Sequence, residues 1–157
     1  MVIFCLSVGP RAAADAPSDI PGYVFWDAGK VDALSKGLYE KLGDKALVWE
    51  TVGNYEGHSV YLVLRGKTRP AELHETESDV QITMGGKATF VIGGELVDAE
   101  SLPRKQQRGS SIRGGTRHPL APGDIMHIPP GVPHQHLIDQ GEPYLYLLIK
   151  IDEEPLN

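Results

Sequence analysis

The pattern of hydrophobic and polar positions changes its period once along the chain, close to Gly43. Upstream of this glycine, apolar residues recur at intervals of three and four positions: Val31, Leu34, Leu38 and Leu42. This spacing places them on one face of a helix, for which Asp27 suits the N-cap and Gly43 the C-terminal cap. The pattern therefore predicts one amphipathic helix over residues 28–42, packed against the outside of a sheet.

Downstream of Gly43 the apolar residues come in short runs that are typical of strands. Turn-forming residues, mostly glycine, separate the clearest of these runs: residues 46–52, 58–64, 68–74, 79–84, 88–92 and 144–151. Residues 66–86 are interpreted as a hairpin. Short strands at this spacing predict an all-β sandwich or barrel over about residues 46–151, within a single domain that covers residues 23–157.

The last run is apolar on both of its faces. One face holds Leu145, Leu147, Ile149 and Ile151, and the other holds Tyr144, Tyr146 and Lys150. A strand of this kind is covered on both sides, either by the helix or by a second subunit. The pattern therefore favours a homodimer.

Residues 95–115 interrupt the rhythm of the strands. This stretch is polar and contains a local excess of positive charge from Arg104, Lys105, Arg108 and Arg113. A long polar loop in a compact domain is either a solvated excursion or a functional lid. We interpret it as a solvated excursion; the alternative is a lid that closes over a pocket and attracts an anionic ligand.

Composition then narrows the class of partner. The chain has 157 residues, of which 41% are hydrophobic and 23% charged, and its formal net charge is −6. An acidic chain argues against nucleic acid or an anionic membrane as its main partner, because both favour a basic surface. A small molecule is the expected ligand. The single cysteine, Cys5, excludes an internal disulfide framework.

Residues 1–22 are interpreted as a leader outside the folded domain. An apolar run over residues 2–8, followed by Ala12, Ala13 and Ala14, resembles the end of a secretory signal peptide, although the basic start is missing. Two alternatives stay open: the remnant of a signal for export to the periplasm or the medium, or a flexible arm of a cytoplasmic protein. No stretch approaches the roughly 20 apolar residues that a membrane helix requires.

Candidate chemistry begins with residues 123–136, which read GDIMHIPPGVPHQH. Gly131 permits backbone angles that other residues avoid, and the prolines around it fix torsions, so His134 emerges where the chain has little freedom. His136 lies two residues further on and faces the same side of a strand. Taken alone, this stretch fits a turn with an ordinary hydrogen-bonded histidine equally well.

A second group of polar residues lies on the earlier hairpin. Glu72 and His74 are two residues apart and share a strand face, and Asp79 begins the next strand after a short link. The same face continues through Gln81 and Thr83. A polar pocket floor of this kind costs stability unless a metal, water or a ligand satisfies it.

The two stretches resemble the two motifs of the cupin superfamily, small jelly-roll β-barrels that often hold one metal ion. The first motif is matched in spacing by Gly66, Glu72, His74, Asp79 and Gly86. Two of its usual ligand types are changed, because Glu72 stands for a histidine and Asp79 for a glutamate. The second motif is matched by Gly123, Pro129, Gly131 and His134, with Ile138 in place of its final asparagine.

This resemblance implies a cupin-type barrel with one N-terminal helix and one divalent transition metal, Fe, Mn, Zn or Ni. The implied ligands are Glu72, His74, Asp79 and His134. Asp79 has a shorter side chain than glutamate, so the alternative is that it supports the ligands or acts as a general base, with His136 in its place on the metal. The other interpretation is a hydrogen-bonded polar cluster without metal.

Two functions follow from these alternatives. The first is a metal-dependent enzyme that acts on a small organic molecule, as a dioxygenase-like oxidoreductase or otherwise as a lyase or isomerase. Asp79, His136 and Gln81 would then move protons or orient the substrate. The second is a non-catalytic protein that binds a small ligand, with a structural metal or none. His58, His118 and His127 are not expected to be ligands.

Overall fold

The computed structural model describes residues 20–152, which form helix α1 (Ala28–Leu42) followed by antiparallel strands in two large sheets and one small sheet. One sheet has the order β1 (Leu47–Tyr55), β2 (His58–Arg65), β13 (Tyr144–Asp152), β4 (Glu77–Gly85) and β11 (Ile125–Ile128). The other has the order β10 (Thr116–Leu120), β5 (Ala88–Ile92), β12 (His134–Leu137), β3 (Ala71–His74), β8 (Gln106–Gly109) and β7 (Glu100–Leu102). The small sheet pairs β6 (Glu95–Val97) with β9 (Ser111–Arg113).

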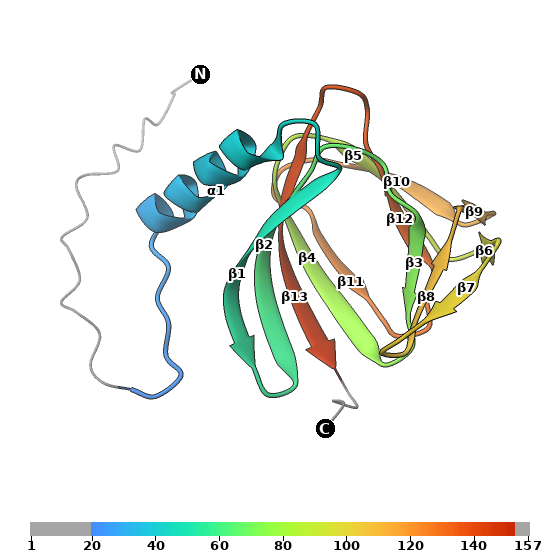
Figure 1. Cartoon of the computed structure of the whole chain (residues 1–157), viewed down its shortest axis with the longest axis horizontal. Helices are drawn as coiled ribbons and strands as arrows, with labels where there is room; N and C mark the ends of the chain where they lie inside the picture. Colours follow the sequence, from blue (N-terminus) through green and yellow to red (C-terminus); the bar gives the residue numbers. More distant parts are fainter. Residues whose placement is uncertain (1–19, 153–157) are drawn as a thin grey trace, which may run out of the picture.

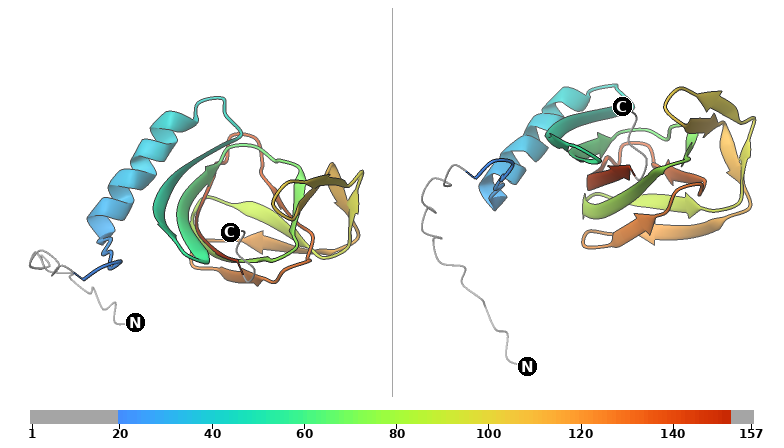
Figure 2. Two further views of the ribbon diagram at one scale, coloured as in Figure 1. Left: turned by 60° about the horizontal axis from the view of Figure 1, so that its bottom comes forward. Right: turned by 90° about the horizontal axis from the view of Figure 1, so that it is seen from below.

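Neighbouring strands in both large sheets come from distant parts of the chain, as β13 does between β2 and β4. The strands curve around a common interior, and α1 lies outside the wall formed by β1 and β2 (Figure 1). Two further directions show the same arrangement (Figure 2). The predicted all-β jelly-roll barrel with an N-terminal amphipathic helix is therefore confirmed.

Helix α1 begins and ends where the sequence predicts. The Asp27 carboxylate accepts a hydrogen bond of 2.7 Å from the Lys30 amide, which satisfies one of the free donors of the first turn. Gly43 ends the helix with a positive φ of 46°. The apolar stripe then packs against the outer side of β1 and β2 in a cluster formed by Leu38, Leu42, Val48, Leu62, Leu64 and Leu145.

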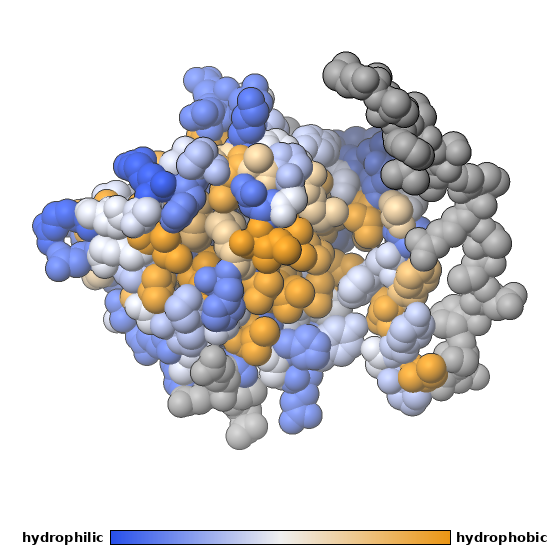
Figure 3. All heavy atoms as spheres, turned by 180° about the vertical axis from the view of Figure 1, so that it is seen from behind, coloured by the Kyte–Doolittle hydropathy of each residue, from blue (hydrophilic) through white to orange (hydrophobic). Residues whose placement is uncertain are grey.

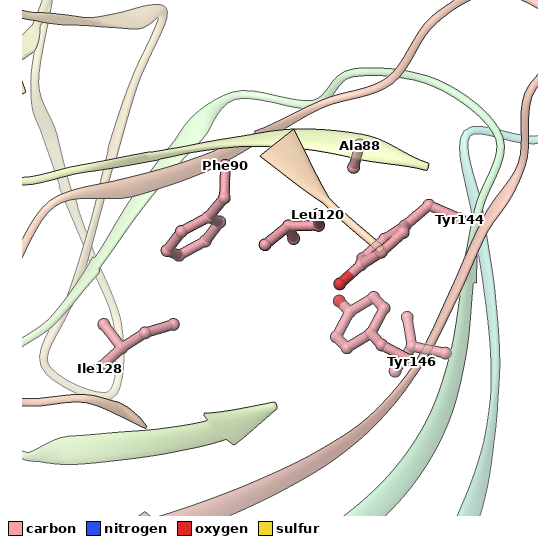
Figure 4. Packing of buried hydrophobic residues seen from close by; sticks show 7 residues of the cluster. Ala88, Phe90, Leu120, Ile128, Tyr144 and Tyr146 are labelled. Atoms are coloured by element: carbon pink, nitrogen blue, oxygen red, sulfur yellow. The ribbon is translucent and has the colours of Figure 1, made fainter. Parts of the chain in front are cut away.

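The interior of the barrel holds a second apolar cluster, contributed by both sheets. Its buried members are Val63, Ala88, Phe90, Leu120, Ile128, Tyr144 and Tyr146. Figure 4 shows the Tyr144 and Tyr146 rings beside one another, and their centroids are 5.1 Å apart. Because these two tyrosines carry hydroxyl groups into the interior, this core is partly polar.

The inner face of β13 carries these tyrosines and Lys150, as the alternation of its residues predicts. On its outer face Leu145 lies beneath the helix, whereas Ile151 is 40% exposed. The helix therefore covers only the first part of the strand. Apolar side chains also gather near the centre of the face seen from behind (Figure 3). The homodimer stays a prediction.

Two interpretations of the sequence are wrong in their local detail. Residues 66–86 do not form a hairpin, since β3 belongs to one large sheet and β4 to the other. Residues 95–115 are not a solvated excursion: they contain four short strands, and β8 pairs with β3 so that Arg108 lies opposite Glu72. Arg108 is therefore part of the barrel wall, whereas Arg113 pairs with Glu95 in the small sheet.

Most of the predicted leader, residues 1–19, lies outside the described residues. Within residues 20–152 no helix has both the length and the apolar character needed to cross a membrane.

Leu38 tests the contribution of the helix to stability, because its side chain is fully buried between α1 and the sheet. We expect Leu38→Ala to lower the free energy of unfolding by about 2–5 kcal/mol through lost burial and a residual cavity. Urea denaturation followed by circular dichroism measures this. Tyr39→Ala is the control, because Tyr39 is 45% exposed on the same helix; equal losses for both variants would contradict the packing described.

Candidate metal centre

The two motif stretches meet where the chain passes from one sheet to the other. Between β3 and β4 it leaves the second large sheet for the first, and between β11 and β12 it returns. His134 lies opposite Glu72 across the β12 and β3 pair, and Ile128 lies opposite Asp79 across the β11 and β4 pair. The Gly131 amide, in a turn with φ of 74°, donates a 2.7 Å hydrogen bond to the His74 carbonyl. This hydrogen bond joins the β3–β4 connection to the β11–β12 connection.

Three of the four predicted ligands form one compact group. Glu72, His74 and His134 each offer a ligand atom, and these atoms lie within 4.8 Å of one another. The separation between His74 Nε2 and Glu72 Oε2 is 3.7 Å. The fourth, Asp79, presents Oδ2 at 3.8 Å from His74 Nε2 and 3.9 Å from His134 Nε2. Glu72, His74 and His134 therefore surround one centre, and Asp79 lies beside the two imidazoles.

Both imidazoles direct a ring nitrogen toward the carboxylates of the group. His134 Nδ1 lies 3.1 Å from the Val132 carbonyl, which can only accept, so Nδ1 carries the proton and Nε2 offers its lone pair. Neither ring nitrogen of His74 has a hydrogen-bond partner among the described residues, although the ring is buried. Burial, together with the positive charge of Lys150, lowers the pKa of His74 to about 4.

In each of the two carboxylates, one oxygen atom contacts a cation and the other faces the imidazoles. Glu72 Oε1 accepts a hydrogen bond from Arg108 and lies 3.8 Å from Arg65 Nη2, while Oε2 faces the imidazole of His74. Although burial opposes ionisation, Arg65 and Arg108 lower the pKa of Glu72 to about 2. Asp79 Oδ1 accepts a 2.8 Å hydrogen bond from Lys150, and Oδ2 faces the centre.

This donor set fits a divalent metal ion. Imidazole nitrogens and carboxylate oxygens are ligands that Fe(II), Mn(II), Zn(II) and Ni(II) accept. The unpartnered buried nitrogens of His74 are the kind of polar atom that a metal bond would satisfy. The surrounding cations hold the free carboxylate oxygens in place.

His136 and Gln81 pair with each other rather than joining this group. His136 Nε2 and Gln81 Oε1 form a 2.8 Å hydrogen bond in the core, and the His136 ring is stacked on Tyr146 at 5.2 Å. Burial lowers the pKa of His136 well below its usual value. Neither side chain lines the cavity beside Glu72, and their roles in substrate binding or proton transfer stay predictions.

The polar floor predicted along β4 is present and is satisfied by other side chains of the barrel. Thr83 Oγ1 lies 2.9 Å from the Tyr144 hydroxyl. Gln81 pairs with His136, and Asp79 pairs with Lys150. Each partner comes from β12 or β13. No metal is therefore required to satisfy Gln81 and Thr83, whereas the nitrogens of His74 have no such partner among the described residues.

Sequence reasoning did not identify the cations that hold the carboxylates. Arg65 donates to the Tyr146 hydroxyl at 2.9 Å and lies beside Glu72, and its side chain is only 9% exposed. Lys150 bridges Asp79 and Glu77. One signal was available in the sequence: Arg65 ends the apolar run that begins at His58, and Lys150 interrupts the apolar run over residues 144–151. Such a residue on the inner face has to find a buried partner.

The remaining histidines lie elsewhere in the described barrel. His58 stacks on Tyr55 with a centroid distance of 4.7 Å. His118 and His127 line a separate cavity between the edge strands β10 and β11, with a volume of about 430 Å³. A different cavity, of about 330 Å³, lies beside the candidate metal centre, and Glu72 is the one candidate ligand in its wall.

Comparison with known proteins supports the fold. No protein-family model matches the sequence, and no curated protein matches it. Among solved structures, DMSP lyase DddQ from Ruegeria pomeroyi DSS-3 superimposes with a TM-score of 0.51 and 17% identity, over 72% of this chain and 50% of that chain. The protein TT1209 from Thermus thermophilus gives a TM-score of 0.50 and 19% identity, over 69% of this chain and 86% of that chain. The chain thus spans about half the length of the DMSP lyase.

A cupin 2 conserved barrel domain protein from Salinispora arenicola CNS-205 is also similar, with a TM-score of 0.47 and 18% identity, over 68% of this chain and 76% of that chain. The two-sheet topology, with both motif stretches crossing between the sheets, decides the fold. The chain folds as a cupin. At these identities the likeness extends to the fold alone, and the function of this cupin has to be argued from its own residues.

The depressed pKa of His74 predicts a pH dependence of stability in the metal-free cupin. Between pH 6.5 and about pH 4 the unfolded chain binds a proton at His74 that the folded chain does not. The free energy of unfolding should therefore decrease as the pH falls through this window, by on the order of 3 kcal/mol from this residue. Urea denaturation in the presence of a chelator, at pH 7 and pH 4.5, measures the change.

The matched variants are His74→Gln and His127→Gln, the second at an exposed histidine. We expect His74→Gln to remove the part of this pH dependence that comes from His74. The part from buried His136, whose pKa is also lowered, should remain. His127→Gln should leave the whole pH dependence intact. The same pH dependence in both variants would show that His74 is not the titrating group.

Proposed function

We propose that this cupin is a metal-dependent enzyme that acts on a small organic molecule. The observation that carries the proposal is the geometry around His74. Both of its ring nitrogens are buried without a hydrogen-bond partner among the described residues, and Nε2 is within 3.8 Å of a carboxylate oxygen from both Glu72 and Asp79. A plain polar cluster would leave these nitrogens unsatisfied, at a cost of about 1–3 kcal/mol for each buried group.

Glu72, His74 and His134 would hold the ion, with Asp79 as a fourth ligand. When bound, a divalent metal ion polarises substrate oxygen atoms and stabilises the negative charge that develops on them. Arg65 and Arg108 would keep Glu72 ionised, and Lys150 would orient Asp79 by its hydrogen bond.

The cavity beside Glu72 would receive the substrate. Its wall combines apolar side chains, among them Val63 and Leu148, with the hydroxyl-bearing ring of Tyr146. The apolar wall would exclude water from one side of the substrate. The Tyr146 hydroxyl, held by Arg65 at 2.9 Å, would offer a fixed polar contact.

Elimination or isomerisation, with Zn, Mn or Ni, is the reaction class that we favour. The reason is Asp79: because its Oδ2 faces the same centre, a bound ion would have two histidines and two carboxylates as ligands. Such an anionic set suits a metal that acts as a Lewis acid.

Iron-dependent dioxygenation is the second candidate. It is favoured by the composition of the three-residue group, since Glu72, His74 and His134 are two histidines and one carboxylate. This is the ligand set of non-haem Fe(II) oxygenases. In that case Asp79 would stay paired with Lys150 and would not bind the metal.

Metal binding is tested on purified protein by elemental analysis and by titration with Zn, Mn, Ni and, without oxygen, Fe(II). We expect one ion per chain, and an affinity at least about 100-fold lower in His74→Ala and His134→Ala, because each removes a ligand. His127→Ala, at an exposed histidine, is the control and should bind as the wild type does. A protein that binds none of these ions, or binds them equally well in both variants, would establish the metal-free polar cluster.

Catalysis is tested by incubating the metal-loaded protein with an extract of small metabolites and following the extract by mass spectrometry. We expect metal-dependent loss of one compound and gain of a product, absent after chelation and in His134→Ala. A product of unchanged oxygen content, formed without oxygen, supports elimination or isomerisation. Oxygen consumption with the Fe(II) protein supports the second candidate. A compound that is retained but unchanged indicates a non-catalytic binding protein.

A further inference from the structure

The wall of the cavity beside Glu72 is unusually basic for an acidic protein. Its charged members are four basic side chains and one acid: Arg65, Arg69, Arg108, Lys150 and Glu72. The charge of the lining residues is therefore +3, from four positive and one negative groups. The chain as a whole has a net charge of −6.

Three of these four cations are already paired. Arg65 and Arg108 contact Glu72, and Lys150 contacts Asp79 at 2.8 Å and Glu77 at 2.9 Å. These contacts hold the candidate ligands, as described above. A ligand that displaced them would expose a buried carboxylate, which is costly.

Arg69 differs from the other three. Within residues 20–152 its guanidinium group has neither a hydrogen bond nor an ion pair, although the residue is half-buried and lines the cavity. Its backbone is held in place, because the Gln135 side-chain amide donates a 2.9 Å hydrogen bond to the Arg69 carbonyl. Pro70 follows it and restricts its backbone further. The structure therefore places an unpaired guanidinium group in the cavity wall, on a backbone that is itself held in place.

The rest of the wall is apolar and limits the size of a ligand. Leu47, Trp49, Tyr61, Val63 and Leu148 contribute to it. A volume of about 330 Å³ has room for about ten non-hydrogen atoms, if each takes the roughly 30 Å³ that one water molecule occupies in the liquid. A ligand that fills it would need an apolar body and one negative group.

We infer that the substrate is a small carboxylate and that Arg69 binds its carboxylate group. The planar guanidinium fork matches a carboxylate with two parallel hydrogen bonds. The apolar body would lie against Trp49 and Leu148, and the reacting end would lie toward Glu72. This inference rests on the proposed function, because it concerns the cavity beside the candidate metal centre.

The test compares carboxylates with their uncharged amides by isothermal titration calorimetry. The probes are benzoate, phenylacetate and succinate, with benzamide, phenylacetamide and succinamide as matched partners. We expect at least one carboxylate to bind the wild type more tightly than its amide. Arg69→Gln should lower the affinity for that carboxylate by about 10- to 100-fold, because a charge-assisted pair is lost, and should leave the affinity for its amide unchanged. Arg69→Lys should retain part of the preference, because it keeps the charge but not the fork.

Arg117→Gln is the matched control, because Arg117 is an exposed arginine on β10 and lies outside the cavity wall. It should behave as the wild type does. If no carboxylate binds more tightly than its amide, the inference is wrong. It is also wrong if the preference survives in Arg69→Gln, since the metal or Arg108 would then hold the carboxylate.

Every titration is repeated on chelator-treated protein, and the metal content of each variant is measured. A preference that depends on Arg69 and persists without metal would support the carboxylate site even if the metal-binding experiments fail. Normal metal binding combined with no carboxylate preference would overturn this inference alone. The two outcomes are therefore separable.

Discussion

The interior of this barrel depends on the mutual neutralisation of charges that are largely buried. Three acids, Glu72, Glu77 and Asp79, meet three bases, Arg65, Arg108 and Lys150, and every acid has a base within 4 Å. Removing one member would leave an uncompensated buried charge, which typically costs about 3–5 kcal/mol. The network can therefore exist only if all six side chains are brought together by the fold.

That pairing explains how the altered ligand set is tolerated. A carboxylate at position 72 adds a negative charge where the cupin motif carries a neutral histidine. Arg65 and Arg108 compensate it on one oxygen, which leaves the other oxygen directed at His74. Lys150 does the same for Asp79. The charges of the network sum to zero, so a divalent ion would make this end of the cavity positive, a property that complements a negatively charged substrate.

Long-range strand pairing supplies the members of this network. Arg65 comes from β2, Asp79 from β4, Arg108 from β8 and Lys150 from β13. These strands become neighbours through pairings such as β13 with β2 and β4, and β8 with β3. The helix takes no part in the network. It covers the outer wall formed by β1 and β2 and so leaves the interior of the barrel for the polar residues.

The sequence by itself determined the local elements and the positions of the ligand candidates. The helix over residues 28–42, the inward polar face of β4 and the four residues Glu72, His74, Asp79 and His134 follow from periodicity and motif spacing, because these depend on near neighbours in the chain. Only the tertiary structure decided that β3 and β4 lie in opposite sheets, that His136 is enclosed by aromatic rings, and that Arg108 reaches Glu72. Contacts of this kind join residues that are far apart in the chain, such as Lys150 and Asp79, which are separated by 71 positions. A basic residue in an apolar run indicates that a buried partner exists, but which residue becomes that partner is decided by strand register, which joins distant parts of the chain.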